Sequence, residues 1–272
     1  MKFVLAGVRV ILILANTGFQ ITLLLIDSAI NGKTIHRGFK HRRRWAKWTM
    51  RICGIKVDEL QGNVDIEPAL IISNHRSLLD PLIQLAYINA FVIAKSEVSS
   101  LPIISQGAKM TGIIFVDRGK LKSRLAAREM TKSVLSGGHN VLVYAEGTTG
   151  TDRTTIKFKP GTFGVATELK VPVISVALEY AEEKDYWYDG SLGSQVIRQI
   201  GVWRTRIKMR ISDPIHDTNS ANLLNTSRKM IDENLIGMQQ DWSAVFKHPP
   251  GENGQLNKPE VKQELNSTGS VD

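Results

Sequence analysis

Apolar residues dominate the first thirty positions of the chain. The stretch from 3 to 30 is broken only by a few polar side chains, and 10–26 contains 17 residues without a charge. The interruptions are Arg9, Asn16, Gln20 and Asp27. A charge-free stretch of this length is at the short end of what spans a bilayer as a helix. It predicts a membrane anchor, either one spanning helix or, with a break at Gly18, two short helices inserted into one leaflet. A cleaved signal peptide fits less well, because the stretch is too long for the apolar part of a signal.

Beyond residue 68, short β-rich runs alternate with stretches of helical periodicity. Strands are predicted at 70–73, 91–94, 113–116, 141–145, 171–177 and 207–211. Helices are predicted at 81–87, 103–109, 120–135, 161–169 and 220–239. Continuous apolar strands that alternate with helices are typical of an α/β domain with a largely parallel sheet flanked by helices. From 247 onward the chain is polar and aperiodic, which predicts a disordered tail.

Charge changes this picture at one place. The formal net charge is +9, yet it is not spread evenly, because no acidic residue occurs between Asp27 and Asp58. That interval, which we call the basic collar, contains nine cationic residues: Lys33, Arg37, Lys40, Arg42, Arg43, Arg44, Lys47, Arg51 and Lys56. The collar follows the predicted anchor directly. By the positive-inside tendency, the collar and the domain after it are expected on the cytoplasmic side of the membrane.

Tryptophans accompany the cationic residues of the collar. If this segment is helical, Arg44, Lys47 and Arg51 share one side, and Trp45 and Trp48 lie next to them. Cationic residues with tryptophan suit the headgroup layer of an anionic membrane. A nucleic-acid surface is the alternative, but it would not need the apolar segment in front. The sequence therefore favours a lipid bilayer as the partner and no nucleic acid.

Three regions follow from these patterns. We expect an anchor and collar at 1–58, an α/β domain at 59–246 and the tail at 247–272. Cys53 is the only cysteine, so no intrachain disulfide can form. No Cys/His cluster has metal-ligand spacing, and no metal is predicted.

The first candidate for chemistry follows the predicted strand at 70–73. The segment 74–80 reads Asn-His-Arg-Ser-Leu-Leu-Asp and places His75 five positions before Asp80. A histidine at a strand end, oriented by a carboxylate, can take a proton from a hydroxyl. Asp80 also precedes Pro81, so it is expected to cap the following helix as well. Alone, this spacing also occurs in ordinary loops.

Two further strand ends carry polar groups. After the strand at 113–116 come Arg118, Gly119 and Lys120, a combination that suits a phosphate ligand or an ordinary solvated loop. After the strand at 141–145 comes Glu-Gly-Thr-Thr-Gly, from Glu146 onward. Glycine allows a ligand to approach the backbone closely. An unpaired carboxylate at the end of an apolar strand would be costly, which favours a site over a simple turn.

Together these motifs resemble those of the glycerolipid acyltransferases. The order is Asn-His-x4-Asp at 74–80, Gly-x-x-Phe-x-x-Arg at 112–118, Glu-Gly-Thr at 146–148 and Val-Pro-Val at 171–173, behind an apolar N-terminus. Within that family, the pattern is most similar to the 1-acylglycerol-3-phosphate acyltransferase branch. The resemblance implies a membrane-associated enzyme that acylates the free hydroxyl of a lysophospholipid, such as 1-acylglycerol 3-phosphate to give phosphatidic acid.

Individual roles follow from the resemblance. It implies that His75 is the general base and that Asp80 orients it. It also implies that Arg118 contacts the acceptor phosphate, while Asn74, Glu146, Gly147 and Thr148 are the other substrate-binding residues. The acyl donor would be acyl-CoA or acyl-carrier protein, with no further cofactor. Transfer would be direct, in agreement with the absence of a Gly-x-Ser-x-Gly elbow from the sequence.

The third motif departs from the usual family pattern. Members generally have Phe-Pro before the glutamate and arginine after the threonine, whereas this chain has Tyr144-Ala145 and Thr149. The missing arginine removes a cation from the acceptor site. Arg153, Lys157 or Lys159 could replace it, or the acceptor could be another lysolipid. A lipid hydrolase and a non-catalytic basic binding protein are the remaining alternatives.

Overall fold

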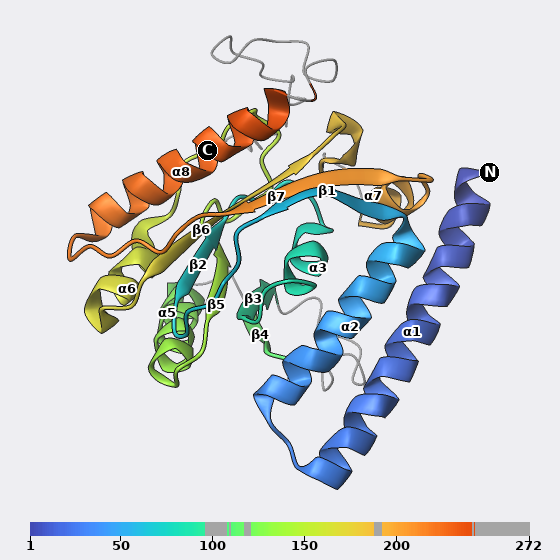
Figure 1. The fold of residues 1–272 in the computed structure, drawn as a ribbon, viewed down its shortest axis with the longest axis horizontal. Helices are drawn as coiled ribbons and strands as arrows, with labels where there is room; N and C mark the ends of the chain where they lie inside the picture. The colour runs from blue at the N-terminus through green and yellow to red at the C-terminus, as the bar shows by residue number, and fades with distance from the viewer. Residues whose placement is uncertain (96–107, 109, 117–120, 188–191, 241, 243–272) are drawn as a thin grey trace, which may run out of the picture.

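One seven-stranded sheet organises the molecule, with strand order β1-β7-β6-β2-β5-β3-β4. The computed structural model describes all residues except 96–107, 109, 117–120, 188–191, 241 and 243–272. Every strand pair in the sheet is parallel except β6 with β7. Helices lie on both sides of the sheet (Figure 1). The predicted fold class, a largely parallel α/β sheet, is confirmed.

The strands are β1 (Ile55–Gln61), β2 (Leu70–Ser73), β3 (Phe91–Lys95), β4 (Ile113–Val116), β5 (Val141–Tyr144), β6 (Val173–Tyr180) and β7 (Thr205–Ile211). The α-helices are α1 (Lys2–Asn31), α2 (Ile35–Cys53), α3 (Asp80–Leu85), α5 (Leu121–Ser136), α6 (Phe163–Leu169), α7 (Leu192–Ile200) and α8 (Ser220–Gln240). Two short 3-10 turns, Pro160–Thr162 and Glu183–Asp185, precede α6 and α7.

The central strand β2 is buried on both faces. Ile71 belongs to one apolar cluster, which it shares with α3 and the N-terminal helices. Leu70 and Ile72 point the other way, into a cluster with α6 and α8. Alternate residues of a strand face opposite sides, so a run of apolar residues is what a doubly covered strand requires.

Most predicted elements are present, with two omissions. Strand β1 and helix α7 were not predicted. In β1 the apolar positions are mixed with charged ones, and the boundary expected at residue 58 falls inside this strand. Helix α5 ends at Ser136, one residue beyond the predicted end, and Gly138 after it has a positive φ of 84°. The predicted helix at 103–109 and the tail at 247–272 lie outside the described residues, apart from residue 108.

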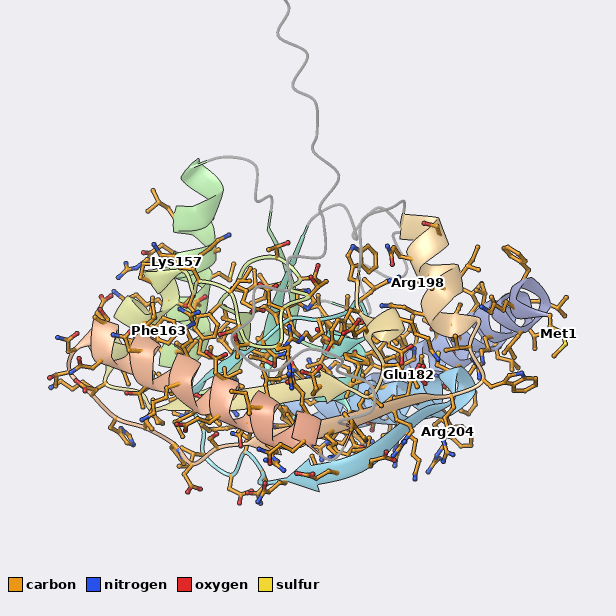
Figure 2. All side chains as sticks on the ribbon, turned by 90° about the horizontal axis from the view of Figure 1, so that it is seen from above. Met1, Lys157, Phe163, Glu182, Arg198 and Arg204 are labelled. Carbon is orange, nitrogen blue, oxygen red and sulfur yellow. The ribbon has the colours of Figure 1, made fainter. Side chains whose placement is uncertain are left out.

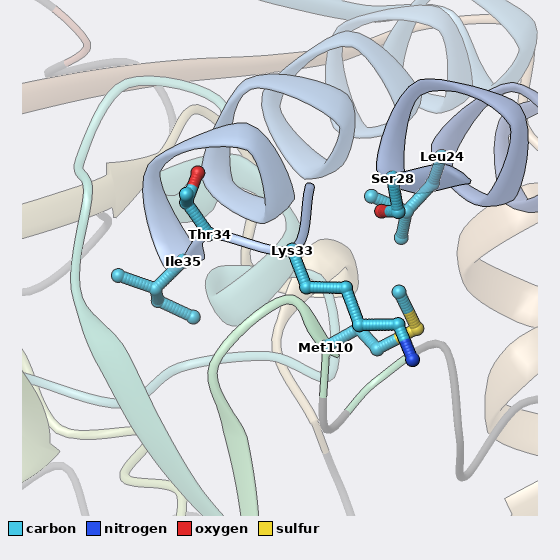
Figure 3. A pocket seen from close by; sticks show the side chains of 6 residues that line it. All are labelled: Leu24, Ser28, Lys33, Thr34, Ile35 and Met110. Atoms are coloured by element: carbon cyan, nitrogen blue, oxygen red, sulfur yellow. The ribbon is translucent and has the colours of Figure 1, made fainter. Parts of the chain in front are cut away.

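The N-terminal segment is one continuous helix. α1 runs unbroken through Gly18 and packs side by side with α2, which the chain reaches through a short turn (Figure 1). Thr34 caps the start of α2, and Gly54, in the left-handed conformation, ends it. A cavity of about 190 Å³ opens at the turn between the two helices (Figure 3). It is lined by Leu24, Ser28, Lys33, Thr34, Ile35 and Met110.

In the described part of the chain, α1 alone is long and apolar enough to cross a membrane, a test that signal sequences and core helices also pass. Only 11% of its most apolar 18-residue stretch is buried within the protein. Large apolar side chains such as Phe3, Ile11, Leu14 and Phe19 are exposed along it. Met1, at its start, and Phe163 in α6 lie at opposite ends of the molecule (Figure 2).

Arg9 fixes α1 to the rest of the protein. Its side chain is buried and donates to the backbone carbonyls of Ile200 (2.8 Å), Val202 and Trp203 (3.1 Å). These carbonyls lie at and just after the end of α7, where no intrahelical donor is available to them. Arg9, the charged residue that interrupts the apolar sequence of α1, therefore caps the end of α7.

The basic collar divides into two groups. Arg42 is buried and donates to the carbonyls of Thr111 and Ile88, and Arg43 donates to Asn89 Oδ1 at 2.9 Å. These two arginines hold α2 against the segments that precede β3 and β4, so they are not available to form an exposed cationic face. The exposed members of the collar include Arg44, Lys47 and Arg51, and Trp48 is exposed beside them.

Replacement of Arg9 by methionine is predicted to loosen the contact between α1 and α7. Three carbonyls would lose a cationic donor, which costs on the order of 1–3 kcal/mol when such groups stay buried. Urea unfolding in detergent should show this loss, and amide exchange should increase at the end of α7. Arg44→Met, on the exposed side of α2, is the matched control. Equal stability of the two variants would contradict the assignment.

Candidate active site

Three neighbouring strands bring the candidate residues to one edge of the sheet. β2 lies between β5 and β6, and Ser73 pairs in register with Tyr144 on one side and Val176 on the other. The strands are parallel, so their carboxyl ends meet at the same edge. In open α/β sheets, ligands bind outside these ends. The segments that follow β2 and β5 carry His75 and Glu146.

His75 and Asp80 form a hydrogen-bonded pair. His75 Nδ1 lies 2.7 Å from Asp80 Oδ2. The carboxylate is fully buried, whereas 22% of the histidine side chain is exposed. An ionised carboxylate can only accept, so the Nδ1 atom carries a proton. In the neutral imidazole, Nε2 is then the nitrogen that can accept a proton.

Asp80 is held by four donors. Its Oδ2 atom accepts the backbone N–H groups of Arg76 (2.6 Å) and Ser77 (2.9 Å), in addition to His75. Its Oδ1 atom accepts the hydroxyl of Tyr180 at 2.6 Å. Burial raises the pKa of Tyr180 well above its ordinary value, so this hydroxyl remains a donor.

The expected helix cap by Asp80 is wrong. Asp80 is the first residue of α3, and its side chain makes no cap hydrogen bond to that helix. The carboxylate instead turns back toward the loop at 75–77, because two backbone N–H groups converge on it there. Asp80 still orders the local backbone, but the backbone that it binds is the loop before α3 and not the helix itself.

The ring of Tyr144 packs against the histidine. The two ring centroids are 4.3 Å apart and the planes differ by 24°. The Tyr144 hydroxyl donates to Gln84 Oε1 at 2.9 Å, and Gln84 Nε2 donates to Ser73 Oγ at 2.6 Å. The tyrosine found in place of the usual phenylalanine therefore still stacks on the histidine, and its hydroxyl adds a hydrogen bond to α3.

Glu146 binds backbone on both sides of the site. Its Oε2 accepts the N–H of His75 at 2.6 Å, and its Oε1 accepts the N–H of Ile156 at 3.1 Å. The loop after β5 makes a second hydrogen bond to the histidine backbone, because the N–H of Gly150 donates to the carbonyl of His75 at 2.8 Å. Burial raises the pKa of Glu146 to about 7 despite these donors and nearby Arg76. In the structure, Glu146 orders the backbone of the histidine.

The other expected substrate-binding residues are placed as follows. Asn74 is buried, and its side chain exchanges two hydrogen bonds, of 2.9 and 2.8 Å, with the backbone of Leu178. Gly147 has a positive φ of 73°, and Thr148 is exposed beside it. Arg118 lies outside the described residues. Roles of these residues in substrate binding stay predictions.

The sequence analysis missed a buried ion pair beneath the site. Arg76 is fully buried and lies 3.3 Å from Glu179 in β6. Its guanidinium also donates to the carbonyls of Gly150, Asp152 and Arg153, so it fixes the loop after β5. Glu179 accepts further hydrogen bonds from Tyr186 (2.6 Å) and Gln239 (2.8 Å). The sequence contained a signal for this pair, because Glu179 is a carboxylate near the end of an apolar strand and Glu146 is a carboxylate just after one.

The site also connects to α7. Gln199 of that helix donates to Ser77 Oγ at 2.5 Å, next to the donors of Asp80. Within the residues that the structure describes, no group of three His, Cys, Asp or Glu side chains is placed to hold a metal ion.

These features define a class of α/β protein with a His–Asp pair at the carboxyl ends of parallel strands. Comparisons with known proteins show what the chain is similar to. The family model described as Acyltransferase matches residues 54–179. A Pseudomonas aeruginosa lyso-ornithine lipid O-acyltransferase is 30% identical over 180 residues, 63% of this chain and 69% of that protein. A Caenorhabditis elegans protein named as a 1-acyl-sn-glycerol-3-phosphate acyltransferase, acl-2, is 28% identical over 201 residues, with 70% and 68% covered.

A solved structure shares the fold. The 1-acyl-sn-glycerophosphate acyltransferase PlsC of Thermotoga maritima superposes with a TM-score of 0.63 at 18% identity, covering 86% of this chain and 98% of that one. This chain belongs to the acyltransferase family, and it is an O-acyltransferase.

The raised pKa of Glu146 predicts that stability depends on pH. Below pH 4.5 this carboxyl is protonated in both the folded and the unfolded chain, and between 4.5 and about 7 only the folded protein keeps the proton. The free energy of unfolding should therefore fall as pH rises through this window, by on the order of 3 kcal/mol. Urea unfolding between pH 5 and 8 measures this.

Glu146→Gln is the test of that assignment. The variant lacks the titrating group, so the wild type should lose stability relative to it as pH rises from 5 to 8. Asp185, whose pKa burial raises to about 6, contributes the same slope to both proteins and cancels in the difference. A difference between the two proteins that is constant across the range would contradict the prediction.

Proposed function

We propose that this protein transfers a fatty acyl group from acyl-CoA or acyl-carrier protein to the free hydroxyl of a lysophospholipid. The preferred acceptor is 1-acylglycerol 3-phosphate, and the product is phosphatidic acid. The proposal rests chiefly on His75, whose Nδ1 is occupied by Asp80 while the side chain stays partly exposed. The names of acl-2 and of PlsC support this acceptor.

The reaction needs one base and no covalent enzyme intermediate. His75 Nε2 takes the proton from the acceptor hydroxyl as the oxygen attacks the thioester carbonyl. When the tetrahedral intermediate collapses, the carbon–sulfur bond breaks and the imidazolium returns the proton to the leaving thiolate. The products are an ester and a free thiol, and the histidine is neutral again.

Asp80 stabilises the imidazolium that forms in this step. Because its carboxylate is fixed by Arg76, Ser77 and Tyr180, it need not reorganise as the charge appears. The stacked ring of Tyr144 limits rotation of the imidazole. In this proposal Arg118, Gly147 and Thr148 bind the acceptor, and Asn74 and Glu146 hold the backbone around it.

A second acceptor is favoured by one observation. Thr149 stands where the family usually has arginine, and the relative from Pseudomonas aeruginosa is named for a lyso-ornithine lipid. A lysolipid with a different headgroup is therefore the alternative substrate. Parallel assays of several lysolipids with one labelled acyl donor separate the two possibilities.

Membrane attachment is part of the proposal. The exposed apolar side chains of α1 would enter the lipid, and Trp48 with Arg44, Lys47 and Arg51 of α2 would lie at the headgroups. Because the α1–α2 pair packs on the domain, its attachment would hold the site near lysolipids. The collar favours the cytoplasmic side.

His75→Ala should remove the base and leave the fold intact. We expect kcat/KM for acyl transfer to 1-acylglycerol 3-phosphate to fall at least ~10²-fold, with a circular dichroism spectrum like that of the wild type and a modest loss of thermal stability, because Asp80 loses one of its four donors. The exposed His216, replaced by alanine, is the matched control and should keep full activity. A folded His75→Ala protein with near-normal transfer would refute the proposed function.

Charges on the apolar face of α1 should release the protein from membranes. Leu14 and Phe19 are 59% and 60% exposed. The double change Leu14→Glu with Phe19→Glu is expected to weaken binding to vesicles of phosphatidylcholine and phosphatidylglycerol by roughly tenfold or more. Flotation measures the bound fraction. Leu125→Glu, at an equally exposed position of α5, should bind as the wild type does; equal losses would argue against a role of α1.

A further inference from the structure

The acceptor site lacks the arginine that normally follows Glu-Gly-Thr, and Thr149 occupies that position. Three nearby cations could compensate: Arg153, Lys157 and Lys159. The structure distinguishes them by what each side chain contacts.

Lys159 lies against the loop that holds the candidate base. Its backbone N–H donates to the carbonyl of Ala145 at 2.8 Å, which sets the two segments side by side. Its side chain then crosses Gly147. A Cβ atom built on Gly147 would lie 2.2 Å from Lys159 Nζ, 2.8 Å from Cε and 3.1 Å from Cδ. The ammonium group therefore lies directly beside Gly147, two residues before Thr149.

The glycine makes this approach possible. Gly147 has a φ of 73°, a conformation that other residues rarely adopt, and any side chain there would displace the lysine. The flanking residues of the loop bind both backbone groups of His75, through Glu146 Oε2 and the N–H of Gly150. Lys159 therefore lies against the same loop after β5 that positions His75.

The other two candidates are placed less well. Arg153 donates through Nε to Gln239 Oε1 at 3.1 Å, and this contact draws its guanidinium toward α8. Lys157 is exposed, but the three heavy atoms nearest to a Cβ on Gly147 all belong to Lys159. Lys159 is exposed to an incoming ligand, and in the described part of the chain no carboxylate forms an ion pair with it.

We propose that the Lys159 ammonium binds the phosphate of the lysophospholipid acceptor, in place of the arginine that is absent at 149. This proposal rests on the proposed function. An ammonium binds phosphate as a point charge with three rotatable donors, without the fixed geometry of a guanidinium fork. The contact requires an anionic headgroup, so it determines preference among acceptors and takes no part in the proton transfer.

The experiment compares two acceptors that differ only in the phosphate: 1-oleoylglycerol 3-phosphate and 1-oleoylglycerol. The full-length enzyme in detergent is assayed with a labelled oleoyl donor. Lys159→Gln should raise KM for the phosphorylated acceptor roughly 10- to 100-fold, the loss expected for one hydrogen bond to a charged group. Its kcat, and its KM for the neutral acceptor, should change less than about threefold.

Two further variants check that charge at this place is responsible. Lys159→Arg should keep a KM near the wild-type value, and adding Thr149→Arg to Lys159→Gln should restore much of the lost affinity. Lys157→Gln removes the same charge two residues away and should leave KM unchanged. If Lys157→Gln raises KM as much as Lys159→Gln, the effect is general electrostatic attraction and the proposal is wrong.

The remaining outcomes separate this proposal from the proposed function. A wild-type enzyme that acylates 1-oleoylglycerol 3-phosphate while Lys159→Gln has an unchanged KM overturns the role of Lys159 alone. Equal losses with both acceptors mean that Lys159 supports the loop and does not bind phosphate, which also overturns it. A wild-type enzyme inactive on the phosphorylated acceptor refutes the proposed acceptor, and the phosphate assignment with it.

Discussion

The buried carboxylate of Asp80 is the constraint on which the rest of the site depends. It has no access to water, so its charge must be balanced by donors from the protein. Two backbone N–H groups, one tyrosine hydroxyl and the imidazole of His75 meet this need. They also fix the turn at 75–77 and the tautomer of the histidine. One desolvated charge therefore orders both the backbone and the base, and it leaves a single ring nitrogen for chemistry.

The turn is secured from the neighbouring strands as well. Glu146, which follows β5, binds the N–H of His75. The buried side chain of Arg76 contacts Glu179 in β6 and the loop after β5. A buried ion pair is weak evidence for stability by itself, since desolvation offsets much of the attraction. Here its value is geometric: it fixes where the loop carrying Gly147 lies relative to the histidine. The loop that carries Gly147 and the histidine are positioned by the same contacts.

A chain of polar contacts extends from the site to the apolar N-terminal helix. Gln199 in α7 donates to Ser77 beside Asp80, and the carbonyl of the next residue, Ile200, accepts from Arg9 of α1. The helix proposed to enter the lipid is therefore attached to the helix that touches the candidate catalytic turn. Two arginines of the collar have a similar effect, because Arg42 and Arg43 bind α2 to the segments before β4 and β3. This arrangement fixes the orientation of the site relative to α1.

Much was determined by the sequence alone, because it depends on local pattern. Apolar runs and periodicity predicted six of the seven strands, the parallel α/β class and the N-terminal helix, and the spacing within 74–80 singled out His75 and Asp80. Strand β1 was missed because charged residues mask its pattern, and Asp80 was wrongly taken for a helix cap because Asp-Pro has that local meaning. Only the tertiary structure could show that Tyr180 binds Asp80, that Glu146 binds the backbone of His75 and that Lys159 crosses Gly147. These contacts join segments far apart in the chain or loops without periodicity, and the packing of strands β5, β2 and β6 decides which of their side chains meet.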